Sequence, residues 1–103
     1  CGPCLSAMPI LDEWVKNDKP ENVIVYSINV WEDDPQDAID YWNENNYDMI
    51  MLFGTDDVAE AYQFPGIPYL CLIDKDGIVR FEELGFSPEL KAVLNSWIRE
   101  LGN

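Results

Sequence analysis

Two cysteines open the sequence, and Gly2 and Pro3 separate Cys1 from Cys4. Such a C-x-x-C pair can exchange disulfides with another protein, supply two ligands to a metal ion, or form a purely structural disulfide. A structural zinc site needs four nitrogen or sulfur ligands, whereas this sequence has no histidine and one further cysteine, Cys71. Zinc is therefore the weakest of the three hypotheses.

A helix is expected to start at the cysteines, because Pro3 suits a first helical position. Apolar residues follow at helical spacing, namely Cys4, Met8, Leu11 and Val15. The N-terminus of a helix stabilises an anion, which lowers the pKa of a thiol below the value of about 8.5 for a free cysteine. We therefore predict that Cys1 is the attacking thiolate and that Cys4 resolves the mixed disulfide, with Gly2 and Pro3 setting the turn and the redox poise.

The remaining sequence predicts alternating helices and strands. Further helices are expected at 35–45, 55–62 and 87–101, and strands at 23–30, 49–53, 69–74 and 78–84. The first two strands are apolar runs typical of buried strands, and the last two should form a hairpin around a Gly-containing turn. The order α-β-α-β-α-β-β-α implies a mixed sheet with helices on both faces.

A second group of residues precedes the third strand, in the segment "FPGIP" from Phe64 to Pro68. An Ile-Pro bond that leads into a strand beside a redox helix suggests a cis proline. Such a bond would let the backbone of Ile67 pair with an extended substrate.

These motifs together resemble the thioredoxin superfamily: "CGPC" on a helix, then "GIP" before "YLCLIDKDGIV". Pro68 lies 64 positions after Cys4, which leaves room for the extra helix-strand unit of the TlpA/ResA-like branch. Pro9, which should kink the first helix, also matches that branch.

The resemblance implies one thioredoxin-like α/β/α domain over residues 1–103, with a mixed central sheet. The strand that precedes the motif in the family is not in this sequence, so we expect the domain to lack N-terminal strands.

The resemblance also implies site residues. Cys1 would be the nucleophile, Cys4 the resolving thiol, and Pro68 the cis proline that faces them. The substrate-binding residues would be Gly2, Pro3, Ile67, Pro68 and Tyr69.

Two positions depart from the family pattern. Ala7 stands where some ResA-like members have a Glu, and Tyr69 replaces a common Thr and would close one side of the substrate groove. We therefore expect general disulfide reduction rather than specialisation for cytochrome c maturation.

The activity implied by the resemblance is thiol:disulfide oxidoreduction, with no cofactor and no metal. The Gly-Pro pair between the cysteines indicates a reducing potential, on the order of −270 mV. The expected partners are a disulfide-containing protein substrate and a membrane thiol-disulfide electron donor. The expected location is the periplasm or another extracytoplasmic compartment.

Other interpretations stay open on the sequence alone. The domain could be a non-catalytic binding module, or part of a larger protein, in which the cysteines are incidental. Cys1 could also be the lipidated first residue of a lipoprotein. A peroxide-reducing relative ranks last among the enzymes, because no Arg precedes Arg80 to polarise a peroxide. Cys71, in an apolar run, is expected to be a buried free thiol without a catalytic role.

The charge of the chain excludes some functions. It has 20 Asp and Glu against 6 Lys and Arg, for a formal net charge of −14. A nucleic acid would be repelled, and so would an anionic lipid surface. The acidic run between Glu32 and Asp40 lacks the glycine and closing Glu of an EF-hand, so it is better explained as a solvated helix start.

Overall fold

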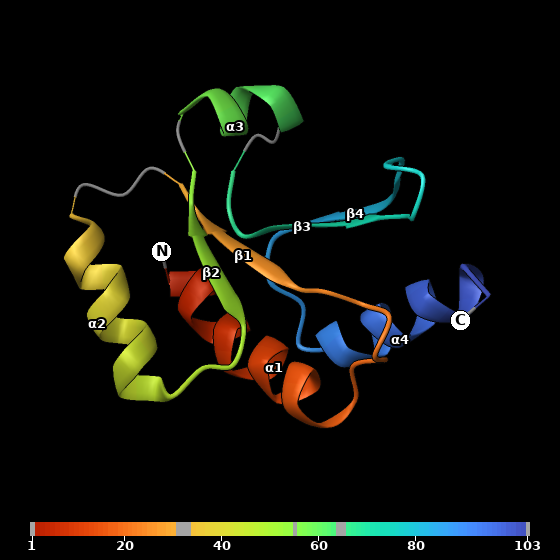
Figure 1. The fold of residues 1–103 in the computed structure, drawn as a ribbon, viewed down its shortest axis with the longest axis horizontal. Coiled ribbons are helices and arrows are strands. Elements are labelled where there is room, and N and C mark those ends of the chain that lie inside the picture. The colour runs from red at the N-terminus through yellow and green to blue at the C-terminus, as the bar shows by residue number, and fades with distance from the viewer. Residues whose placement is uncertain (1, 31–33, 55, 64–65, 103) are drawn as a thin grey trace. The chain divides into compact units, whose positions relative to one another are not determined.

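The computed structural model describes residues 2–30, 34–54, 56–63 and 66–102. Cys1, Thr55 at the start of the predicted helix 55–62, and Phe64 at the start of "FPGIP" lie outside these ranges. The predicted order of elements is confirmed (Figure 1). The helices and strands are α1 (Gly2–Asn17), β1 (Tyr26–Asn29), α2 (Pro35–Asn45), β2 (Ile50–Phe53), α3 (Asp56–Tyr62), β3 (Tyr69–Ile73), β4 (Val79–Leu84) and α4 (Leu90–Glu100).

The chain forms two compact units. Unit 1 comprises residues 1–11 and 64–103, and unit 2 comprises residues 12–63. Helix α1 runs without interruption through Pro9. Its residues up to Leu11 belong to unit 1, and its remaining residues belong to unit 2. Unit 1 also contains β3, β4 and α4, while unit 2 contains β1, α2, β2 and α3.

The strands have both orientations that a mixed sheet requires. Within the described residues they form two ladders, a parallel pair β1–β2 in unit 2 and an antiparallel pair β3–β4 in unit 1. Strand β1 is shorter than the predicted 23–30, since β2 offers it only the partners Ile50 to Phe53. The expectation that β1 and β2 are buried is wrong, because Tyr26, Ile28 and Leu52 are exposed.

Helix α2 has the boundaries that its sequence predicts. The side chain of Asp34 accepts a hydrogen bond from the backbone N–H of Gln36 at 3.0 Å, which caps the helix just before Pro35. Asn46 ends the helix in the left-handed conformation, at φ 53°. Near this end, the indole of Trp42 donates to the carbonyl of Met49 at 3.0 Å and so holds α2 against the start of β2.

A buried carboxylate ties the end of α1 to the segment before β2. Oδ1 of Asp12 accepts hydrogen bonds from the backbone N–H groups of Asp48 and Met49, at 2.7 and 3.1 Å. Lys16 contacts the same carboxylate at 2.9 Å and donates to the carbonyl of Asn46, also at 2.9 Å. The hydrogen bond with Asp12 raises the pKa of Lys16. All these groups belong to unit 2, so Asp12 fixes its helix to its sheet.

The β3–β4 hairpin of unit 1 is confirmed. Asp74 accepts from the backbone N–H groups of Asp76 and Ile78, at 2.9 and 3.0 Å, and Gly77 adopts φ +82°, which glycine tolerates without strain. These hydrogen bonds, with Arg80 3.3 Å away, hold the pKa of Asp74 below its usual value.

Helix α4 contributes the main apolar stripe of unit 1. Leu90, Leu94 and Ile98 are buried, and Trp97 stacks on Phe81 of β4 with ring centroids 5.6 Å apart. The helix begins at Leu90 rather than near position 87. The hydroxyl of Ser87 accepts the N–H of Glu89, and this forms a turn before the helix starts.

The role of Asp12 leads to a stability prediction. Asp12→Ala leaves two backbone N–H groups without their acceptor, and should lower the free energy of unfolding by about 2 to 4 kcal/mol. Asp12→Asn keeps an oxygen acceptor and loses the charge, so the expected loss is about 1 kcal/mol. Urea unfolding of both variants measures the difference, and an equal loss in the two would contradict this role of the carboxylate.

Candidate functional site

The described half of the C-x-x-C motif lies in the first turn of α1. The helix begins at Gly2, one residue earlier than predicted, so Pro3 and Cys4 both lie in its first turn. Cys4 is half-buried and disulfide-bonded. Its predicted partner in the motif, Cys1, is outside the described residues. The structure therefore contains Cys4 in its oxidised form.

The segment around this turn carries no charged side chain of its own. Residues 1–11 include no charged side chain, and Ala7 is buried where some relatives were expected to have a Glu. Gly2 and Pro3 are exposed, and the hydroxyl of Ser6 donates to the carbonyl of Gly2 at 3.4 Å. Within this segment itself, the helix dipole is therefore the source of positive potential.

The second group of predicted site residues lies where β3 begins. The peptide bond between Ile67 and Pro68 is cis, the isomer expected from the sequence. Both residues and Tyr69 are half-buried. The carbonyl of Pro68 accepts the N–H of Gly85 at 2.8 Å, and Tyr69 pairs in register with Leu84. The end of β4 therefore holds this segment in place.

The predicted site residues all belong to unit 1. Gly2, Pro3 and Cys4 share the first turn of α1, and Ile67, Pro68 and Tyr69 lie together at the start of β3. Unit 1 thus combines a helix N-terminus that holds a cysteine with a cis-proline segment.

Cys71 is a free cysteine, as predicted, although it is half-buried rather than fully buried. It lies in the middle of β3, opposite Glu82 of β4. Burial raises the pKa of the Cys71 thiol, and the negative charge of Glu82 raises it further. Its thiolate is therefore disfavoured, which fits a packing role.

Sequence reasoning assigned no role to Asp12. Two features of the sequence could have indicated a buried, paired carboxylate at Asp12. It lies between the apolar residues Leu11 and Trp14, which are both buried, and Lys16 follows one helical turn later. An acidic residue on the buried side of a helix usually has a hydrogen-bonding partner.

The described part of the chain offers neither a membrane-spanning helix nor a metal site. No helix there has both the length and the apolar character needed to cross a membrane. Among the same described residues, no group of three or more His, Cys, Asp or Glu side chains could hold a metal ion.

Comparisons with known proteins identify the family. The profile of the Redoxin family matches residues 1–96. A solved structure assigned as thiol:disulfide interchange protein DsbE from Chlorobium tepidum is similar, with a TM-score of 0.84 and 25% identity over 97% of this chain and 71% of that chain. A thioredoxin-like superfamily protein is similar with a TM-score of 0.83 and 27% identity, over 100% of this chain and 74% of that chain. A search of curated proteins found no match.

The chain belongs to the Redoxin family, and its fold is thioredoxin-like. This confirms the expected membership of the thioredoxin superfamily, and at the level of the family the protein is a thiol:disulfide oxidoreductase.

The environment of Cys71 leads to a prediction about reactivity. Because its pKa is raised, Cys71 in the reduced native protein should react with iodoacetamide at pH 8 severalfold more slowly than a cysteine in a short peptide. Peptide mapping by mass spectrometry measures the rate at each cysteine. The same protein in urea is the control, and equal rates with and without urea would show that the fold does not protect this thiol.

Proposed function

We propose that the protein reduces protein disulfides by dithiol-disulfide exchange, with Cys1 and Cys4 as the reacting pair. The observation that carries this proposal is the disulfide-bonded Cys4 in the first turn of α1, in a structure where Cys71 is free. Because the chain has three cysteines, Cys1 is the partner that we propose for Cys4. Membership of the Redoxin family supports the same chemistry.

The reaction begins at the sulfur of Cys1. Its thiolate attacks one sulfur of the substrate disulfide, a mixed disulfide forms, and the other substrate sulfur leaves as a thiolate that takes up a proton. The thiol of Cys4 then loses its proton and attacks Sγ of Cys1. The Cys1–Cys4 disulfide forms, and the second substrate sulfur leaves as a thiolate and is protonated. Two electrons pass from the cysteine pair to the substrate, and no cofactor takes part.

The roles of the two cysteines follow from their positions. Cys1 comes just before α1, where the positive end of the helix dipole favours a thiolate, and no charged side chain in residues 1–11 opposes it. Cys4 is half-buried, which suits a thiol that attacks only within the mixed disulfide. With Gly-Pro between them, the pair should be reducing, at about −270 mV.

The substrate would bind across the two groups of residues in unit 1. We assign this surface to Gly2, Pro3, Ile67, Pro68 and Tyr69. The exposure of Gly2 and Pro3 supports the assignment, as does the anchoring of Pro68 and Tyr69 to the end of β4. Tyr69 would limit one side of the surface.

The remaining assignments rest on the resemblance to TlpA/ResA-like proteins. The substrate would be a protein with a disulfide, and a membrane thiol-disulfide protein would return electrons to the oxidised Cys1–Cys4 pair. Both reactions would take place in the periplasm or another extracytoplasmic compartment. The similar structure assigned as a thiol:disulfide interchange protein supports the exchange chemistry.

Cysteine variants test the proposal. Cys1→Ser should abolish the reduction of insulin disulfides, because no attacking sulfur remains. Cys4→Ser should accumulate a mixed disulfide with substrate, visible by non-reducing gel electrophoresis and mass spectrometry, because no resolving sulfur remains.

Cys71→Ser is the matched control, and it should keep the activity of the unchanged protein. If Cys1→Ser stays active, the cysteines are incidental and the protein is better described as a binding module. Loss of activity in Cys71→Ser alone would also contradict the proposed pair.

A further inference from the structure

Two tyrosines of unit 2 bring their hydroxyl groups together. Tyr41 lies in α2, and Tyr47 follows the left-handed residue that ends this helix. Their hydroxyl oxygens are 3.0 Å apart, within the range of a hydrogen bond. The two rings meet edge to face, with centroids 5.7 Å apart, and both side chains are half-buried. The fold thus holds the two phenols in contact.

A third aromatic ring lies against this pair. Trp42, also half-buried, meets Tyr47 edge to face with ring centroids 5.0 Å apart, and its centroid is 6.4 Å from that of Tyr41. The indole N–H donates to the carbonyl of Met49, which fixes the orientation of the ring. We call Tyr41, Trp42 and Tyr47 the aromatic cluster.

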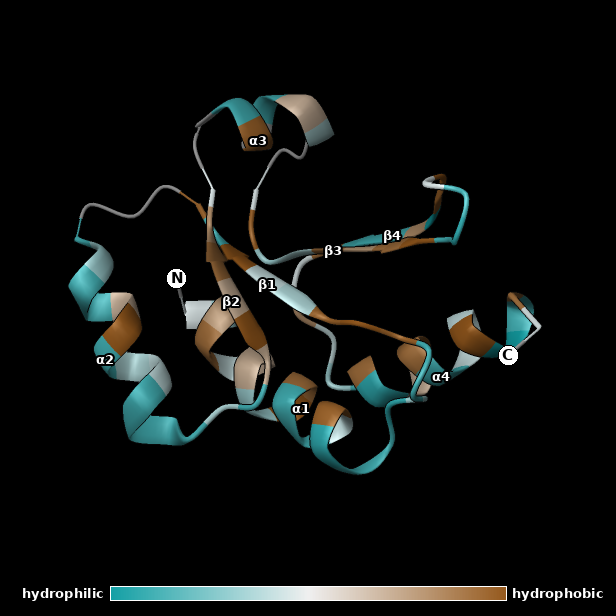
Figure 2. Cartoon of the chain, viewed as in Figure 1, coloured by the Kyte–Doolittle hydropathy of each residue, from teal (hydrophilic) through white to brown (hydrophobic). Residues whose placement is uncertain are grey.

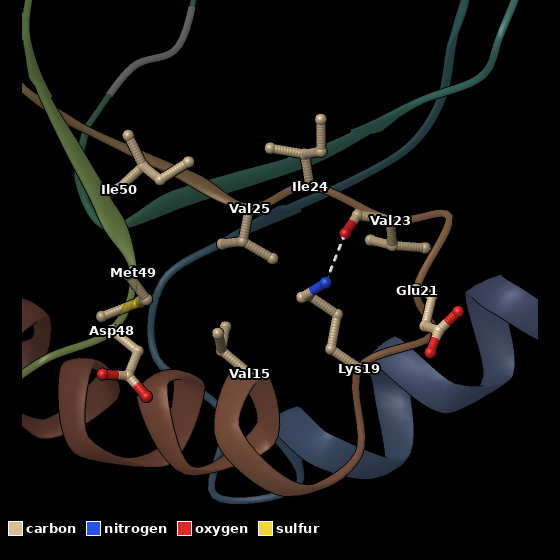
Figure 3. Close-up of a pocket in the computed structure, with 9 residues that line it drawn as sticks. All are labelled: Val15, Lys19, Glu21, Val23, Ile24, Val25, Asp48, Met49 and Ile50. Atoms are coloured by element: carbon tan, nitrogen blue, oxygen red, sulfur yellow. Dashed lines mark hydrogen bonds between the residues drawn. The ribbon is translucent and has the colours of Figure 1, made fainter.

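The aromatic cluster joins α2 to the rest of its unit. Helix α2 is mostly hydrophilic (Figure 2), and none of its 11 residues is buried. Asp48 and Met49, which follow Tyr47 in sequence, lie beside α1 (Figure 3), and their backbone N–H groups donate to its Asp12 carboxylate. The contact between Tyr41 and Tyr47 therefore connects a lightly packed helix to an anchored segment.

Two phenols held in contact can be coupled by oxidation. A one-electron oxidant removes an electron and a proton from a phenol, and the unpaired electron of the resulting phenoxyl radical also resides on the ring carbons next to the C–OH carbon. Two such radicals join through these carbons, and the hydrogen displaced on each ring moves to its oxygen. Holding the two reactants side by side makes this coupling far faster than an encounter in solution.

The protonation of Tyr47 fits this chemistry. Burial raises the pKa of its hydroxyl, and the hydrogen bond with Tyr41 raises it further, so Tyr47 is a neutral phenol at neutral pH. Its oxidation therefore releases a proton together with the electron. Trp42 offers a second route, because an indole radical there can take an electron and a proton from Tyr47, which restores the indole and leaves a phenoxyl radical.

Coupling between two copies of the chain is disfavoured. Tyr26 and Tyr62 have exposed fractions of 54% and 38%, so they would be the first tyrosines to meet those of another copy. Each copy carries a net charge of −14, however, and the two therefore repel each other at low ionic strength. The contact between Tyr41 and Tyr47 already exists within one chain.

We propose that Tyr41 and Tyr47 form a dityrosine cross-link when two equivalents of a small one-electron oxidant, an inorganic radical, act on the protein. Each equivalent takes up one electron, two protons pass to water, and one carbon–carbon bond forms between the rings. This bond would fasten α2 to the segment that Asp12 holds. The inference does not depend on the thiol chemistry.

Controlled oxidation of the complete protein tests the cross-link. Azide radicals, which are small and uncharged, oxidise tyrosine and tryptophan by one electron, and dityrosine reveals itself by its blue fluorescence. Cleavage after glutamate then gives the peptide 33–44, whose single tyrosine is Tyr41. It also gives the peptide 45–60, whose single tyrosine is Tyr47. Mass spectrometry of the monomeric protein should find these two peptides joined and two hydrogens lighter than their sum.

Phenylalanine variants locate the cross-link. Tyr41→Phe and Tyr47→Phe should each abolish the joined peptides, because one of the two phenols is missing. Tyr62→Phe is the matched control, since it removes a more exposed tyrosine outside the aromatic cluster, and it should leave the yield unchanged. Circular dichroism checks that each variant is folded, and the peptide map of the unchanged protein stands even if a variant is not.

Several results would overturn the proposal. Oxidised wild-type protein without the joined peptides 33–44 and 45–60 would contradict it, and so would a joined pair found only in dimeric protein. A joined pair that persists in Tyr47→Phe would place the bond elsewhere. These measurements read a bond between two rings and not disulfide reduction, so their failure leaves the assignment of Cys1 and Cys4 unaffected.

Discussion

The chemistry proposed for this protein depends on where helix α1 begins. A helix stabilises negative charge only within its first turn, so a cysteine there is activated and a cysteine two turns later is not. Helix α1 begins at Gly2 and has Cys4 in its first turn. No side-chain charge occurs before Asp12, so within this segment the backbone supplies the field that would favour a thiolate. The roles proposed for Cys1 and Cys4 follow from this one constraint.

The same helix is also part of the framework of unit 2. Beyond Leu11, α1 carries Asp12, whose buried carboxylate holds the backbone before β2, and Trp14, which is almost completely buried. One continuous helix therefore carries Cys4 in its first turn and is fixed by hydrogen bonds and packing in its later turns.

Local signals made much of this fold predictable from the sequence. Asp34 caps α2 just before Pro35, and Gly77 lies in the turn of the hairpin, so the start of α2 and the hairpin both depend on residues close in sequence. The hydrogen-bond partner of Asp12 could not be predicted in this way, since Asp48 is 36 positions away. The exposure of Ile28 was also missed, because an apolar run indicates which residues avoid water but not whether another element covers them. Of the site, the sequence predicted the cysteine helix and the cis proline, while the exposure of each residue required the structure.

A thiol titration measures the central claim most directly. Absorbance at 240 nm follows thiolate formation in reduced Cys71→Ser, where Cys1 and Cys4 are the two remaining thiols. One thiol should titrate clearly below the pKa of about 8.5 of a free cysteine, and adding Cys1→Ser should remove that transition. If both thiols titrate at or above that value, the start of α1 does not stabilise a thiolate, and the proposed mechanism is contradicted.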